Sequence, residues 1–215
     1  MRKIFGVMVL TAVTASIASS ATIPAVTYDS IPTTSGHSGN SSTTHGWIFT
    51  LSAPVEVVGL GYYDHLGNGL SEAHQVGIYN GSGLLLVPTT VPASTSGLLV
   101  DRYRYIMVTS VTLAPGVYTI GGTMGEAASD EAGYHPVGLV AIPEISGIQG
   151  RYTEVGTYTT LSLPTLLYPV GSPYSMWAGP NFLVSTGESA VPEPNAGLLL
   201  IAPVSAFFLF RRRVH

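Results

Sequence analysis

The stretch HQVGIYNGSGLLLV, from His74 to Val87, carries the clearest local sign of the fold. Val76, Ile78 and Tyr79 lead into an Asn-Gly pair at residues 80 and 81, and an apolar run follows. Asn-Gly tolerates the positive φ angles that a tight hairpin turn needs. The stretch therefore predicts two antiparallel strands joined by a short turn.

Similar short strands are predicted on both sides of this hairpin. Their segments are THGWIFTL, VEVVGLGYYD, RYRYIMVTSVTL, VYTI, VGLVAI, GRYTEV and GPNFLVS, beginning at residues 44, 55, 102, 117, 137, 150 and 179. No long segment with the helical period occurs over residues 22–190, and many short strands separated by Gly and Pro favour a sandwich. The predicted fold class is all-β, with a single antiparallel β-sandwich of jelly-roll type over residues 46–186. Residues 22–45, which include TTSGHSGNSSTT, are expected to form a polar arm or loop.

Charge and cysteine content narrow the functional classes. The 215-residue chain contains no cysteine, which excludes disulfide bonds and thiolate metal sites. Residues 22–190 contain eleven acidic residues and three arginines, so their net charge is 3 − 11 = −8 with neutral histidines. Nucleic-acid binding needs cations that neutralise phosphates, so we expect no nucleic-acid partner.

The first 21 residues, MRKIFGVMVLTAVTASIASSA, have the order of a secretory signal peptide. Arg2 and Lys3 precede an apolar segment that runs to about Ile17, and small residues follow. We place the cleavage site after Ala21, with cleavage after Ala18 as the alternative. The chain is therefore expected to be exported through the Sec route.

The other end of the chain predicts a short transmembrane helix over residues 196–210, which are apolar apart from Ser205. At about 1.5 Å per residue, fifteen residues span roughly 22 Å, which is less than the roughly 30 Å of a hydrocarbon core. Pro203 weakens the helix further because it lacks a backbone donor. The basic residues after the span favour the cytoplasm for residues 211–215 and place the β-domain outside.

The C-terminal region resembles the PEP-CTERM sorting signal. Its matching elements are Val191, Pro192, Glu193 and Pro194 within the linker 187–195, then the apolar span, then Arg211, Arg212 and Arg213. The resemblance implies a bacterial protein that is first anchored in the inner membrane and then released to the cell surface or extracellular space. It also implies processing by an exosortase-type enzyme and an association with extracellular polysaccharide and biofilm.

A second resemblance concerns the β-domain. The stretches GWIFTLSAPVEVVGLGYYD, HQVGIYNGSGLLL, VTLAPGVYTIGG and WAGPNFLV follow the order seen in a family of uncharacterised bacterial extracellular domains. This resemblance implies a jelly-roll sandwich, and it implies no activity because the family has none assigned.

One segment, YYDHLGNGLSEAH, gathers the polar groups that most resemble a site. Asp64, Asn68 and Glu72 supply hard oxygen donors suited to Ca²⁺. A zinc site at His65 and His74 is a weaker alternative, because a third ligand is not evident. The other interpretation, which we favour, is a hydrated loop without a cofactor. The acidic pair at residues 130 and 131 is interpreted as a solvated turn.

No catalytic motif accompanies these residues, so we expect the protein not to be an enzyme. Tyr103 and Tyr105 alternate with arginines in RYRYI, which predicts an exposed aromatic patch that could stack on sugars. The expected function is that of an exported surface or extracellular-matrix protein whose β-domain is structural or binds an unknown ligand. The alternative is a carbohydrate-binding module that acts on extracellular polysaccharide.

Overall fold

The computed structural model describes residues 20–31, 33–35, 43–124, 130, 132–134, 136–154, 160–168 and 177–187. The chain divides into two units, of which residues 21–187 form the β-domain. The other unit holds residues 1–20 and 188–215, so the sorting motif and the predicted transmembrane span lie outside the described residues. Within the described part of the chain, no helix has the length and hydrophobicity needed to cross a bilayer.

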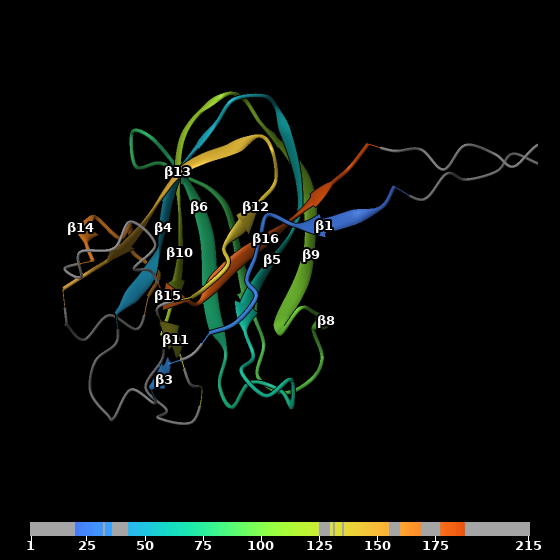
Figure 1. Cartoon of the computed structure of the whole chain (residues 1–215), viewed down its shortest axis with the longest axis vertical. Helices are drawn as coiled ribbons and strands as arrows, with labels where there is room; N and C mark the ends of the chain where they lie inside the picture. Colours follow the sequence, from blue (N-terminus) through green and yellow to red (C-terminus); the bar gives the residue numbers. More distant parts are fainter. Residues whose placement is uncertain are drawn as a thin grey trace, which may run out of the picture. The chain divides into compact units, whose positions relative to one another are not determined.

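Antiparallel sheets make up the β-domain, and the described residues contain strands but no helix (Figure 1). The five-stranded sheet has the order β1 (Thr22–Pro24), β16 (Pro180–Ser185), β5 (Val55–Tyr63), β9 (Tyr103–Leu113) and β8 (Leu98–Val100). The six-stranded sheet has the order β14 (Leu166–Leu167), β13 (Ile145–Tyr152), β4 (Thr44–Leu51), β10 (Gly116–Thr123), β6 (His74–Asn80) and β7 (Leu85–Val91). Two small sheets are β15 (Trp177–Ala178) with β11 (Ala132–Tyr134) and β3 (Thr33–Ser35), and β12 (Val140–Ala141) with β2 (Val26–Thr27). The all-β prediction is confirmed.

The two larger sheets share one hydrophobic core. Trp47 and Phe49 on β4 contact Phe182 on β16, with ring centroids 5.8 and 5.4 Å apart, and all three side chains are fully buried. The indole Nε1 of Trp47 donates to the carbonyl oxygen of Pro180 at 3.1 Å, which satisfies its polar atom inside the core. This cross-sheet packing is typical of two sheets stacked face to face.

The hairpin predicted from residues 74–87 is present, but its turn differs from the expected one. β6 and β7 pair antiparallel from His74 opposite Val91 to Tyr79 opposite Leu85. The side-chain oxygen of Asn80 accepts hydrogen bonds from the backbone N–H groups of Ser82 and Leu84, and Gly83 takes the left-handed φ of 85°. The turn is therefore longer than an Asn-Gly hairpin, because the Asn80 side chain organises it.

The polar arm predicted over residues 22–45 is replaced in part by sheet structure. β1 pairs with β16, and β2 pairs with β12. Ala25 and Val26 are fully buried in the main core, so the N-terminal segment contributes apolar surface to the fold. The β-domain consequently begins near residue 22 and not at residue 46.

Candidate functional site

A pocket of about 270 Å³ lies beside the loop that connects β5 to β6. Its wall contains ten residues from three separate parts of the chain: Tyr63, Asp64, His65, Leu66, Asn68, Gly69, Leu70, Ser71, Ser94 and Asp130. The wall therefore combines carboxylate, imidazole, amide and hydroxyl groups with a few apolar surfaces. It includes most of the segment that the sequence marks as a candidate site.

Asp64 is one of two carboxylates of this wall that are held by a buried basic side chain. Its Oδ2 atom accepts hydrogen bonds from the Nε of Arg104 at 2.8 Å and from the backbone N–H of Gly69 at 2.9 Å. The Arg104 side chain is 8% exposed and the Asp64 side chain 2% exposed. The other guanidinium nitrogens donate to the backbone carbonyls of Gly67, Thr95 and Gly97. One arginine thus fixes two loops and neutralises one carboxylate.

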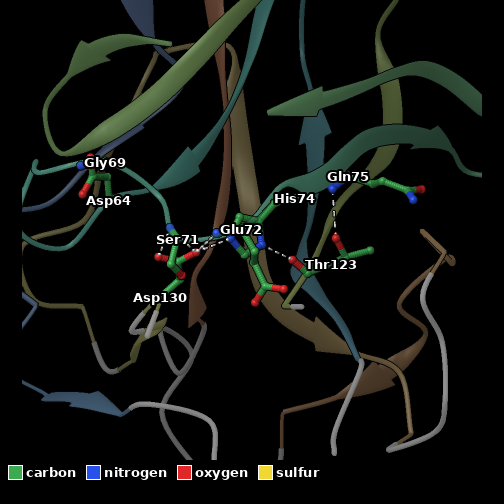
Figure 2. A network of polar contacts seen from close by, with 8 residues as sticks. All are labelled: Asp64, Gly69, Ser71, Glu72, His74, Gln75, Thr123 and Asp130. Carbon is green, nitrogen blue, oxygen red and sulfur yellow. Dashed lines mark hydrogen bonds and ion pairs between the residues drawn. The ribbon is translucent and has the colours of Figure 1, made fainter. Parts of the chain in front are cut away.

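Asp130 is the second carboxylate, and its partner is His74 at the start of β6 (Figure 2). The Nε2 of His74 lies 3.0 Å from Oδ2 of Asp130, while Nδ1 lies 2.8 Å from the carbonyl oxygen of Thr123 on β10. A carbonyl oxygen only accepts, so Nδ1 must carry a proton. The Asp130 carboxylate also accepts from the backbone N–H groups of Ser71 and Glu72.

These contacts set the charge state of Asp130. Burial alone would raise the pKa of this carboxyl, but the hydrogen bonds from His74, Ser71 and Glu72 outweigh it and hold the pKa below its usual range. When Nε2 of His74 also carries a proton, it donates to the Asp130 carboxylate. The His74 ring stacks on Tyr62 with centroids 3.8 Å apart and planes 3° apart. Burial, with the nearby charges of Asp130 and Glu72, raises the pKa of that tyrosine.

A backbone bridge holds the β5–β6 loop against the loop that contains Ser94. Leu70 and Ser94 form an isolated antiparallel bridge, with N–O distances of 2.6 and 3.2 Å. Gly69 has a φ of 107°, and a Cβ at this position would lie 2.9 Å from the carbonyl carbon of Ser94. A side chain at residue 69 would therefore meet both strain and a steric clash. Glycine is required here for the two loops to approach each other.

The predicted Ca²⁺ ligands are distributed over this site in a different way from the expectation. Asp64 and Asn68 line the pocket, whereas Glu72 does not line it and donates its backbone N–H to Asp130. Figure 2 shows Asp64 and Gly69 apart from the group formed by Ser71, Glu72, His74 and Asp130. Among the described residues, no cluster of three or more His, Asp or Glu side chains is arranged to hold a metal ion. For the zinc alternative, both nitrogens of His74 are already engaged.

The predicted exposed patch at Tyr103 and Tyr105 is wrong. Both side chains are 1% exposed and pack with Tyr63, whose ring centroid lies 5.5 Å from that of Tyr103. Burial raises the pKa of both phenols well above the usual range. Arg104, which should have marked the wet face, is buried as well because its guanidinium reaches Asp64. At this end of β9 both faces are covered, so the alternation of Arg and Tyr does not separate inside from outside.

The interpretation of the acidic pair at residues 130 and 131 as a solvated turn is wrong for Asp130, whose side chain is 6% exposed. Its importance was missed because its partner His74 lies 56 residues earlier in the chain. Arg104 was likewise missed as a partner of Asp64, which lies 40 residues earlier. The sequence shows an arginine within a predicted strand but does not show that it is buried, so it gave no signal for either partner.

Comparison of the chain with protein-family models, with curated proteins and with solved structures found no match.

Proposed function

We propose that the protein is an exported surface or extracellular-matrix protein that carries a C-terminal PEP-CTERM sorting signal. The observation that carries this proposal is the order of three elements near the C-terminus: the Pro-Glu-Pro triplet, the apolar segment 196–210, and three consecutive arginines. A signal peptide over residues 1–21 would bring the chain to the membrane. The apolar segment would hold it there until an exosortase-type enzyme processes the tail.

The ends of the β-domain support this proposal. Thr22 on β1 pairs with Ser185 on β16, and the backbone N–H of Thr186 donates to the carbonyl oxygen of Ala21 at 3.0 Å. The two ends of the domain therefore leave it on neighbouring strands, which lie side by side in Figure 1. The compact unit of residues 21–187 begins at the proposed signal-peptidase site and ends at the proposed linker. Removal of both flanking segments would leave all the strands of the domain in place.

The physical properties of the tail suit a temporary tether. A span of roughly 22 Å is shorter than the hydrocarbon core, so it holds the chain at a modest cost of bilayer thinning. Proline on both sides of Glu193 would favour an extended recognition segment, because proline disfavours helix. For the β-domain we propose a single jelly-roll-like sandwich. We also propose that it has no enzymatic activity, because His74 is buried and both of its ring nitrogens are engaged in hydrogen bonds.

The test is mass spectrometry of the C-terminus of the mature protein from its native host. We expect a C-terminal peptide that ends near the Pro-Glu-Pro triplet. Replacing Pro192, Glu193 and Pro194 with Ala should leave the protein anchored and unprocessed. The neighbouring double variant Glu188→Ala with Ser189→Ala is the matched control and should be processed normally. An intact Arg-Arg-Arg-Val-His terminus on most wild-type molecules would mean a permanent anchor and would contradict the proposal.

A second candidate function is a carbohydrate-binding module for extracellular polysaccharide. The observation that favours it is the 270 Å³ pocket, whose wall carries several polar side chains at or near the surface. The buried Tyr103 and Tyr105 have no part in this candidate function. The pocket also allows the class of ligand to be specified.

A further inference from the structure

We infer that the pocket beside the β5–β6 loop binds one neutral sugar unit, such as the end or a side branch of a polysaccharide. The inference rests on the proposed carbohydrate-binding role and assigns it a site and a ligand class. It is independent of how the C-terminal tail is processed. Size, hydrogen-bonding chemistry, charge and rigidity of the wall each contribute to the assignment.

The pocket volume suits a small ligand. Sites for drug-sized molecules range over roughly 300–1,000 Å³. The present pocket, at about 270 Å³, lies just below that range. A single ring with its substituents is the appropriate scale, whereas a longer segment of a polymer would have to extend out of the pocket into solvent.

The outer wall offers both donors and acceptors. Asn68, Ser71 and Ser94 are exposed and His65 is half-buried. The Ser71 hydroxyl already bonds to Asp130, and Nδ1 of His65 lies 3.2 Å from the Tyr63 hydroxyl, so the amide of Asn68 and the hydroxyl of Ser94 would make the main contacts to a ligand. A sugar ring carries several hydroxyl groups that each donate and accept, and these side chains can match both roles. Leu66, which is 73% exposed, adds an apolar surface for the C–H groups of a ring.

The charges of the wall select against ionic ligands. Asp64 and Asp130 lie at its buried end, with side chains 2% and 6% exposed, and their partners are the buried Arg104 guanidinium and the buried His74 imidazole. A cation would therefore compete with an existing partner at either carboxylate. No lysine or arginine lines the pocket among the described residues, and residues 22–190 carry a net charge of 3 − 11 = −8. An anionic sugar would find no free cation and an unfavourable field.

The wall is also held in place before any ligand arrives. Arg104 fixes the loops around residues 67 and 95–97, and the bridge between Leu70 and Ser94 joins them. Asp130 fixes the backbone at Ser71. Because these groups need little ordering on binding, a small neutral ligand can be recognised with few contacts.

The experiment uses the full chain in a detergent that carries no sugar headgroup. Saturation-transfer NMR and titration calorimetry would measure binding of glucose, galactose, mannose and N-acetylglucosamine, each free and as an oligosaccharide. Glucuronate and galacturonate serve as anionic counterparts of two of these probes. We expect at least one neutral probe to bind. We expect both uronates to bind at least about tenfold more weakly than that probe.

Two variants locate the site. Ser71→Trp should fill the pocket and abolish binding, while the backbone N–H that Ser71 donates to Asp130 is retained. Asn68→Ala removes one amide and should weaken binding about three- to tenfold. Their matched controls are Ser110→Trp on β9 and Gln149→Ala on β13, both at exposed positions, and these should bind like the wild type.

Melting temperatures separate loss of fold from loss of the site, and Asn68→Ala provides the decisive measurement if Ser71→Trp fails to fold. The inference would be overturned by failure of every neutral probe to bind, by equal or tighter binding of a uronate, or by binding that Asn68→Ala leaves unchanged. Binding that is lost in chelator would also overturn it, because it would show that the ligand is held through a metal ion. None of these results affects the mass of the mature C-terminus, so the sorting proposal is tested independently of the sugar site.

Discussion

The two ion pairs at the buried end of the pocket have similar geometry but different cations. Arg104 lies 2.8 Å from Asp64, and His74 lies 3.0 Å from Asp130. A guanidinium is charged at every pH that a protein survives, whereas an imidazole is charged only when both of its nitrogens carry protons. The cation of the Arg104 pair therefore keeps its charge, while the charge of the His74 side chain depends on which of its atoms are protonated.

The pairs also connect different parts of the fold. Arg104 lies on β9 and holds two loops next to the five-stranded sheet. His74 lies on β6 of the six-stranded sheet, binds β10 through Thr123, and holds Asp130, which lies beyond the end of β10. Each pair thus holds segments next to one of the two sheets. The pocket lies where the segments held by the two pairs meet. Variants of Arg104 and of His74 can therefore measure the contribution of each pair to stability separately.

The largest effect is expected for Arg104→Met, which leaves the Asp64 carboxylate buried without its cation. Breaking a buried pair from one side costs about 3–5 kcal/mol of unfolding free energy, because an uncompensated charge remains. Loss of the hydrogen bonds to three carbonyls acts in the same direction. Chemical denaturation would measure the change. Arg102→Met, at an exposed neighbouring residue, is the control, and an equally small effect of both variants would contradict the role of the Arg104 pair.

A smaller loss is expected for His74→Phe. The phenyl ring can keep the stacking on Tyr62, but the hydrogen bonds to Asp130 and Thr123 are lost. Asp130 still accepts from two backbone N–H groups, so we expect about 1–3 kcal/mol of destabilisation. His65→Phe, at a half-buried position, should change the unfolding free energy by less. A larger loss for His74→Phe than for Arg104→Met would reverse the order of the two pairs.

These pairs also mark the limit of what the sequence predicts. The strands followed from local patterns, because alternation and turn residues act over a few positions. The partners of Asp64 and Asp130 depend on how distant strands align, which no local pattern specifies. The error at Tyr103 and Tyr105 has the same origin, since tertiary packing covers both faces of β9 there. The YYDHLGNGLSEAH segment was recognised as a candidate site because it concentrates polar side chains between two strands, and most of it lines the pocket.

The pH dependence of stability distinguishes the pairs further. Because the pKa of Asp130 is lower in the folded state, the unfolded state binds more protons between that pKa and the ordinary value near 4. The part of the stabilisation that comes from ionisation of Asp130 is therefore present above about pH 4 and is lost as the pH falls through the folded-state pKa. Asp130→Asn should flatten this part of the curve of unfolding free energy against pH. Asp101→Asn, at an exposed turn, should leave the curve unchanged, and an unaltered slope in Asp130→Asn would contradict the assignment.

The smallest effect is expected from calcium. The Asp64 and Asp130 carboxylates already have Arg104 and His74 as partners, and Glu72 does not line the pocket, so we expect the same melting temperature in chelator and in excess Ca²⁺. An ion bound only by the folded state would add about 2.7 kcal/mol to the free energy of unfolding when its concentration is one hundred times its dissociation constant. For a chain of this size that corresponds to a rise of roughly 5–10 °C, which a thermal melt detects easily. If such a rise occurs, Glu72→Gln identifies its origin. A rise that this variant removes would identify Glu72 as a Ca²⁺ ligand and would contradict the expectation of a loop without a metal ion.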